Sequence, residues 1–135
     1  MQTHAKGTFE TKAWSEQPYS EVEGAPKITQ GSMMDSFTGD IKGEATIGAL
    51  MAYTSDSSVN FVGLERVVGH IGSRSGSFIL QLSGKFDMAA AKGTCTWSVV
   101  PSSATGDLRG LRGEGGYIWN GEKQVPYSCR FYGHL

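Results

Sequence analysis

Three glutamates within alternating, strand-forming runs have the clearest capacity for chemistry in this chain: Glu44, Glu65 and Glu114. A carboxyl group that points into an apolar barrel loses its hydration, so its pKa rises and it can act as a general acid or base on a bound small molecule. Strand alternation can equally place each glutamate on the solvated outer face, which is the commoner outcome for a carboxylate without a partner. The glutamates become catalytic candidates only if two or three of them converge inside the barrel.

Arginine side chains are the available partners for these carboxylates. Arg112 and Glu114 are two residues apart and share one strand face, which allows an ion pair that points inward. The glycines around Arg112 indicate crowding that an ordinary surface strand would not need. The alternative is a solvent-facing pair worth at most about 1 kcal/mol. Arg66 follows Glu65 directly and must point to the opposite face, so Glu65 needs another cation.

Aromatic residues supply walls for a pocket. They are spread over all the expected strands, and Tyr53 combines a ring with a hydroxyl group that can hydrogen-bond to a ligand. A filled core is the commoner use of such residues, and a ligand site needs an open volume of roughly 300 Å³ or more. If a cavity exists, we expect an apolar chamber with one polar group. Its ligand-binding residues are then Tyr53, Glu65, Arg112 and Glu114, and its catalytic candidates are Glu44, Glu65 and Glu114.

Motifs for other chemistries do not stand out in the sequence. No helical pattern follows the glycine-rich segment 105–117 to aim amide groups at a phosphate, so nucleotide binding is not predicted. His4, His70 and His134 are isolated, without the spacing of a metal site, and no Gly-x-Ser-x-Gly segment indicates a serine hydrolase. The sequence therefore implies neither a metal nor a cofactor.

Composition limits the number of domains, the partners and the compartment. The chain has 135 residues, 39% of them hydrophobic, which suits one domain spanning 1–135. A formal net charge of -1 favours neither nucleic acid nor a membrane surface as a partner. The apolar runs are far shorter than the roughly 20 residues of a spanning helix. We expect a cytoplasmic protein in which Cys95 and Cys129 stay reduced.

Strand-like runs alternate with turn signals along the chain, without a convincing helical period. The connection 18–26 is expected to be the longest loop, and Gly39 and Asp40 are expected to close a hairpin. The expected strands are 4–14, 28–38, 41–54, 59–71, 75–86, 94–100, 108–119 and 124–131. Eight long strands in this order would leave two long edges unless they close. We therefore predict an all-β fold with a single eight-stranded antiparallel up-and-down barrel, with a two-sheet sandwich or a flattened barrel as alternatives.

Five blocks spread over nearly the whole chain carry a family resemblance: Ala5–Glu10, Met51–Tyr53, Phe61–Val67, Gly76–Phe78 and Gly113–Gly116. Together they resemble an uncharacterised bacterial family, a domain of unknown function with an allene oxide cyclase barrel-like, calycin-like fold. Segment 105–117 is also similar to a strand of plant dirigent proteins. The resemblance implies the barrel and, because relatives of this fold commonly associate, a homo-oligomer (dimer or trimer). It implies no activity, because the family has none assigned.

Two functions of different class are consistent with these observations, and a third needs no ligand. The leading hypothesis is a binding module for a small, mostly apolar molecule. The alternative is an acid-base cyclase or isomerase that uses glutamates in the barrel cavity, and the second alternative is an oligomeric scaffold with a filled core. The direction of the glutamates discriminates between them, because inward convergence favours catalysis.

Overall fold

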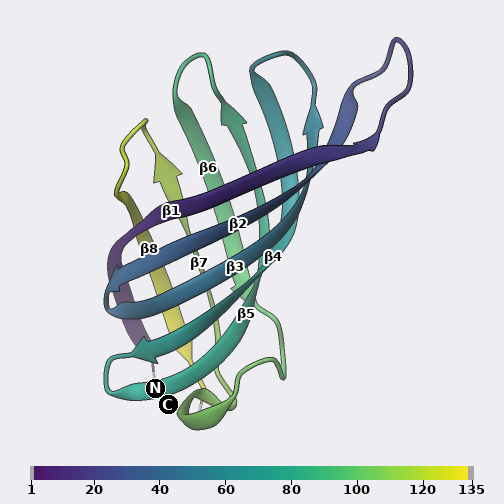
Figure 1. Cartoon of the computed structure of the whole chain (residues 1–135). Coiled ribbons are helices and arrows are strands. Elements are labelled where there is room, and N and C mark those ends of the chain that lie inside the picture. Colours follow the sequence, from purple (N-terminus) through teal and green to yellow (C-terminus); the bar gives the residue numbers. More distant parts are fainter. Residues whose placement is uncertain (1, 134–135) are drawn as a thin grey trace.

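The protein is a closed barrel of eight antiparallel strands in up-and-down order, as a computed structural model shows for residues 2–133 (Figure 1). The strands are β1 (Gln2–Ser20), β2 (Lys27–Gly39), β3 (Ile41–Tyr53), β4 (Ser58–Ile71), β5 (Arg74–Asp87), β6 (Lys92–Val99), β7 (Arg112–Trp119) and β8 (Val125–Tyr132). Each strand pairs with the next along the chain, and β1 pairs with β8 to close the sheet. The predicted fold class is confirmed.

Alternation of side chains explains why these segments form a barrel. In β6 and β8 every second residue is buried, and the buried residues are apolar or glycine. Because successive side chains of a strand point to opposite faces, each strand sends one apolar row into the interior. Burial of these rows is favourable at about 25 cal/mol per Å² of apolar surface, and closure pairs the first strand with the last.

Strand β1 is longer than expected and bends. Its register on β2 shifts between Thr11 and Ala13, so Lys12 is an extra residue of the bulged strand. β1 pairs with β8 only as far as Phe9, and beyond that point it pairs with β2 alone. Figure 1 shows the β1–β2 hairpin reaching past the rest of the barrel. The expected end of the first strand at 14 is therefore wrong, because the strand continues to Ser20.

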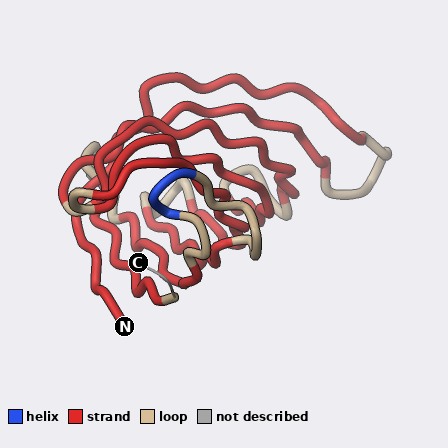
Figure 2. Tube along the Cα trace, turned by 90° about the horizontal axis from the view of Figure 1, so that it is seen from below, coloured by secondary structure: helices blue, strands red, loops and turns tan. Residues whose placement is uncertain are grey.

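A short connection covers one end of the barrel. Gly106–Leu108 form a 3₁₀ helix, η1, which Figure 2 shows lying across the end that faces the viewer. Leu108 and Leu111 are fully buried there. The expected strand 108–119 therefore begins only at Arg112, because residues 108–111 belong to the connection that covers this end of the barrel. In the described part of the chain, no helix is long and apolar enough to cross a membrane.

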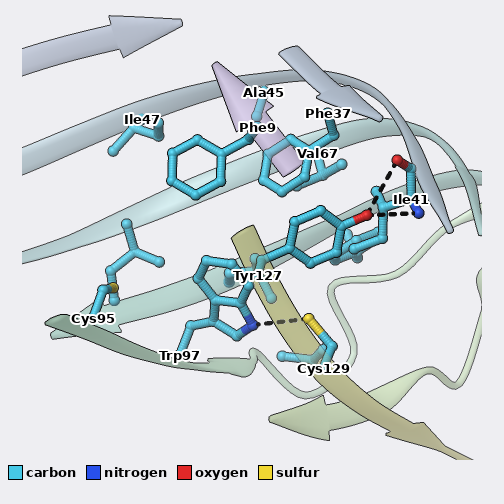
Figure 3. Packing of buried hydrophobic residues seen from close by; sticks show 14 of the residues in the cluster. Phe9, Phe37, Ile41, Ala45, Ile47, Val67, Cys95, Trp97, Tyr127 and Cys129 are labelled. Atoms are coloured by element: carbon cyan, nitrogen blue, oxygen red, sulfur yellow. Dashed lines mark hydrogen bonds between the residues drawn. The ribbon is translucent and has the colours of Figure 1, made fainter. Parts of the chain in front are cut away.

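Aromatic side chains fill the interior near this covered end (Figure 3). The Tyr127 hydroxyl accepts a hydrogen bond from the Ile41 N–H at 2.9 Å and donates one to the Thr38 carbonyl at 2.9 Å. Phe37 packs edge-on against Tyr127, with ring centroids 5.3 Å apart. These contacts satisfy a buried phenol within an apolar core, so this part of the interior is packed and not open.

Candidate functional site

A cavity of about 340 Å³ lies inside the barrel, toward the end opposite η1. Its wall is mainly apolar, with Phe9 from β1, Ile47 from β3 and Phe61 from β4 among the lining residues. Met88 in the β5–β6 turn and Lys123 in the β7–β8 turn lie at its mouth. The volume lies within the range of small-molecule sites.

Glu65 on β4 lies deep in this cavity wall. Its exposed fraction is 3%, and no hydrogen-bond partner of its Oε2 atom is found among the described residues. Burial raises the pKa of Glu65 well above its usual value, and the negative charge of Asp35 raises it further. A carboxyl group in this setting favours its neutral, protonated form, because a buried charge without a partner is costly.

Asp35 on β2 is the second buried carboxyl of the cavity. Its exposed fraction is 5%, and it accepts a hydrogen bond from the Thr11 hydroxyl at 2.8 Å. Burial raises the pKa of Asp35 to about 6, while the bond from Thr11 acts in the opposite direction. Thr11 faces Asp35 because it is the last residue of β1 before the bulge. A bulge of this kind re-aims side chains at a functional site.

The barrel brings the two carboxyls to one wall. Asp35 is paired with Ala45, and Glu65 is paired with Ile47, two residues further along β3. All four residues are buried, so the two acids point inward on either side of β3. Across the cavity, the pKa of the Tyr117 phenol is raised by burial and by the charges of several neighbours, the two acids included. The acids and the phenol therefore lie within electrostatic range of one another.

A charged group occupies the mouth of the cavity. The Glu10 carboxylate forms ion pairs with Lys12 at 2.6 Å and with Lys123 at 3.9 Å, and it accepts a hydrogen bond from Gln124. The hydrogen bond from Lys12 holds the pKa of Glu10 below its usual value. Glu10 is thus an ionised carboxylate paired with lysines at the rim, whereas the acids inside form no ion pair among residues 2–133. Pro18, further along β1, pairs with Thr29 and is exposed.

Of the three glutamates that the sequence offered as candidates, Glu65 is the one that faces the interior. Glu44, Arg112 and Glu114 are exposed on the outer face. Glu44 accepts a hydrogen bond from Ser36 at 3.2 Å, and Glu114 accepts one from Tyr132 at 3.1 Å. The expected interior group of Glu44, Glu65, Arg112 and Glu114 is therefore corrected, because shared spacing puts Arg112 and Glu114 on one face without saying which face.

Tyr53 belongs to a different cluster. It is half-buried, and its hydroxyl donates a hydrogen bond to Glu16 at 2.5 Å, as does the Thr29 hydroxyl. Burial, followed by the bond to Glu16, raises the pKa of Tyr53 to about 12. The Lys27 Nζ atom lies 4.8 Å above its ring. Tyr53 does not line the cavity, so the expected pocket wall at this position is corrected.

The two thiols are free and buried. Burial, followed by the charge of Glu65, raises the pKa of Cys95 to about 12. Burial also raises the pKa of Cys129 to about 12, and its sulfur accepts a hydrogen bond from the Trp97 indole at 3.3 Å. Neither thiol has the lowered pKa of a nucleophile, so both act as packing residues. Among residues 2–133, no three His, Cys, Asp or Glu side chains gather to hold a metal ion, and His134 lies outside this range.

The fold and the site together define a small up-and-down β-barrel with an apolar cavity and two buried acids. The model of a family described as a protein of unknown function (DUF3224) matches residues 5–131, and the chain belongs to this family. A DUF3224 protein of unknown function from Shewanella oneidensis MR-1 has a similar crystal structure, with 27% sequence identity, a TM-score of 0.77 and 100% coverage of both chains. The comparison with curated proteins gives no match.

Proposed function

We propose that this protein binds a small, mostly apolar molecule inside the barrel, with one polar group of the ligand turned toward Asp35 and Glu65. The observation that carries the proposal is the open, apolar volume of about 340 Å³ around two buried acids. A protein that needs only a stable core fills such a volume, because each missing contact reduces stability. The cavity therefore favours binding over a scaffold with a filled core.

The resemblance to the allene oxide cyclase barrel-like fold supports the same proposal. That enzyme class uses a mostly apolar pocket with a carboxylate, which is the same combination of surfaces as in this cavity. The buried carboxyls of this cavity come from β2 and β4, whereas Glu10 on β1 is held by lysines at the rim. The shared feature is thus the type of pocket and not a set of matched residues.

The test is to fill the cavity without altering the outside. Ala49 lines the cavity, and Leu50, the next residue of β3, is exposed on the outer face. In the Ala49→Phe variant we expect binding of the neutral fluorophore N-phenyl-1-naphthylamine to fall at least tenfold. The matched Leu50→Phe variant should bind like the parent, since its new ring points outward. Equal binding by all three proteins, at equal thermal stability, would contradict an interior site.

A further inference from the structure

We propose that Asp35 and Glu65 act as an acid-base pair that moves a proton within a small apolar carbonyl compound. The barrel would then catalyse enolisation of a ketone, or the shift of a carbon-carbon double bond into conjugation with it. The proposal rests on the proposed function, because the carbonyl compound would occupy the same cavity. It adds a reaction and a substrate class to that site.

The first support is that neither buried acid forms an ion pair among the described residues. Buried carboxyls in proteins are normally paired with a cation or hydrogen-bonded on both oxygens. Here both ion pairs of the described residues, 2–133, involve Glu10 at the rim. The Oε2 atom of Glu65 has no partner in that part of the chain, although the side chain is only 3% exposed and lines the cavity. A molecule in the cavity can supply the missing hydrogen bond to this atom.

The second support is that the two acids differ in their surroundings. Thr11 donates a hydrogen bond to Asp35, which stabilises the ionised form of that group. The more deeply buried Glu65 lacks such a bond at Oε2 and also lies near the charge of Asp35. Asp35, with a pKa of about 6, is therefore mainly a carboxylate near neutral pH, while the raised pKa of Glu65 favours its protonated form. Two carboxyls pushed apart in this way take the roles of base and acid.

The reaction needs only these two groups. The Asp35 carboxylate removes a proton from the carbon next to the carbonyl, and the electron pair of that C–H bond becomes the carbon-carbon double bond of the enolate. The carbonyl π electrons move to oxygen, where the Glu65 O–H donates a hydrogen bond to the developing charge. Asp35 then returns the proton to the same carbon or to the far end of a conjugated double bond. Atoms and electrons balance without a co-reactant.

The cavity suits this chemistry, because its wall is mainly apolar and the other groups near the pair among residues 2–133 do not compete as bases. The titratable or charged groups near the pair are Tyr117 from β7, Cys95 from β6, Cys129 from β8, Glu10 from β1, and Glu122 and Lys123 from the β7–β8 turn. Burial raises the pKa of Tyr117 and of Cys95, so both stay neutral near pH 7. Glu10 and Lys123 are paired at the mouth. Asp35 is therefore the interior group that ionises near pH 6.

The experiment follows the exchange of the α-protons of cyclohexanone for deuterium in D₂O by proton NMR. We expect the parent protein to accelerate the exchange roughly 100-fold or more over the Asp35→Asn variant, which has no base. The parent rate should rise through a pH near 6 and fall at higher pH, where Glu65 loses its proton. Glu65→Gln keeps a hydrogen-bond donor, so it should stay within about tenfold of the parent and lack the fall at high pH. Glu65→Leu should lose the acceleration.

Glu44→Gln is the matched control, because Glu44 is exposed on the outer face of the neighbouring strand and should leave the rate unchanged. Displacement of N-phenyl-1-naphthylamine by cyclohexanone separates the two proposals. If the ketone binds but exchanges equally fast in the parent and in Asp35→Asn, proton transfer is overturned while the binding function stands. Proton transfer is also overturned if the protein binds hexylamine in preference to cyclohexanone and does not accelerate α-proton exchange. The cavity would then be a cation site. If neither N-phenyl-1-naphthylamine nor cyclohexanone binds, both the binding function and proton transfer fail.

Discussion

Burial without compensation separates Asp35 and Glu65 from the other acids of this chain. Glu10 is held by two lysines, and Glu44 and Glu114 are exposed. The two interior acids are at most 5% exposed and face an apolar cavity. Such groups cost stability when ionised, so they are retained where function needs them.

The cost of ionising Asp35 predicts a pH-dependent stability. Its pKa is about 6 in the folded protein, above the 3.8 of an ordinary aspartate, so the folded state binds the proton more tightly. This stability is fully present below about pH 4 and is lost as the pH rises through about 6, by roughly 3 kcal/mol at 1.36 kcal/mol for each unit of pKa shift. Urea unfolding should show Asp35→Asn to be more stable than the parent by about 1–3 kcal/mol at pH 8 and to lack this loss. A variant that is less stable at pH 8 would contradict the argument.

The residues also show what sequence reasoning can reach at this site. Glu65 was predicted as a candidate because a glutamate within an apolar alternating run is unusual. Asp35 was missed, although Met33 and Phe37 flank it at the same period of two. Its hydrogen-bond partner is the Thr11 hydroxyl, which lies opposite it at the bulge in β1. Neither the bulge nor the cavity has a signature in local sequence, because both arise from strand pairing.

At the scale of elements, strand order and strand existence were predictable, but some boundaries were not. β1 runs through Pro18 to Ser20 because beyond Phe9 it is an edge strand with one neighbour, where a missing N–H is tolerated. η1 takes the place of the expected start of β7, because Leu108 and Leu111 are buried at the covered end of the barrel. Both departures follow from how the barrel ends are closed, which alternation alone does not encode.

The glycines of β7 predict a sharp difference between two substitutions. A Cβ atom on Gly115 would lie 2.8 Å from the Cα of Cys129 and 2.9 Å from the Trp97 indole nitrogen, so Gly115→Ala forces neighbouring strands apart. We expect it to lower the free energy of unfolding by about 1–3 kcal/mol, as overpacking does. Gly48→Ala is the control, because a Cβ there meets open space, and it should be neutral or stabilising. Equal unfolding midpoints in urea for the two variants would show that the strand contacts are not tight.

At the scale of the whole molecule, η1 covers one end of the barrel (Figure 2), and the cavity opens toward the other end. The closed eight-stranded topology followed from the sequence, because strand number and turn spacing leave few alternatives. The sequence did not predict whether side chains fill the interior of the barrel. Composition gives the number of apolar side chains but not the empty volume between them. The open volume beside a packed core is thus a property of the assembled barrel.

The outer surface predicts self-association. Leu50 on β3 is paired with Val62 on β4, and both are exposed, as is Leu64 on the same face of β4. A cluster of exposed apolar side chains favours contact with a second copy, so we expect a dimer or trimer. Sedimentation equilibrium should give a multiple of the chain mass for the parent and a lower mass for Val62→Lys. A parent protein that sediments as a single chain at high concentration would refute this prediction.

The ionisation of the two interior acids tests the account most directly, because binding and proton transfer both depend on it. Carbon-13 NMR of the side-chain carboxyls across pH 3 to 9 would follow Asp35 and Glu65 separately. We expect a midpoint near pH 6 for Asp35 and a Glu65 carboxyl that remains protonated beyond neutral pH, because both are desolvated in the cavity. Midpoints near 4 for both groups would mean that they are fully hydrated, and would contradict an apolar chamber built around an acid-base pair.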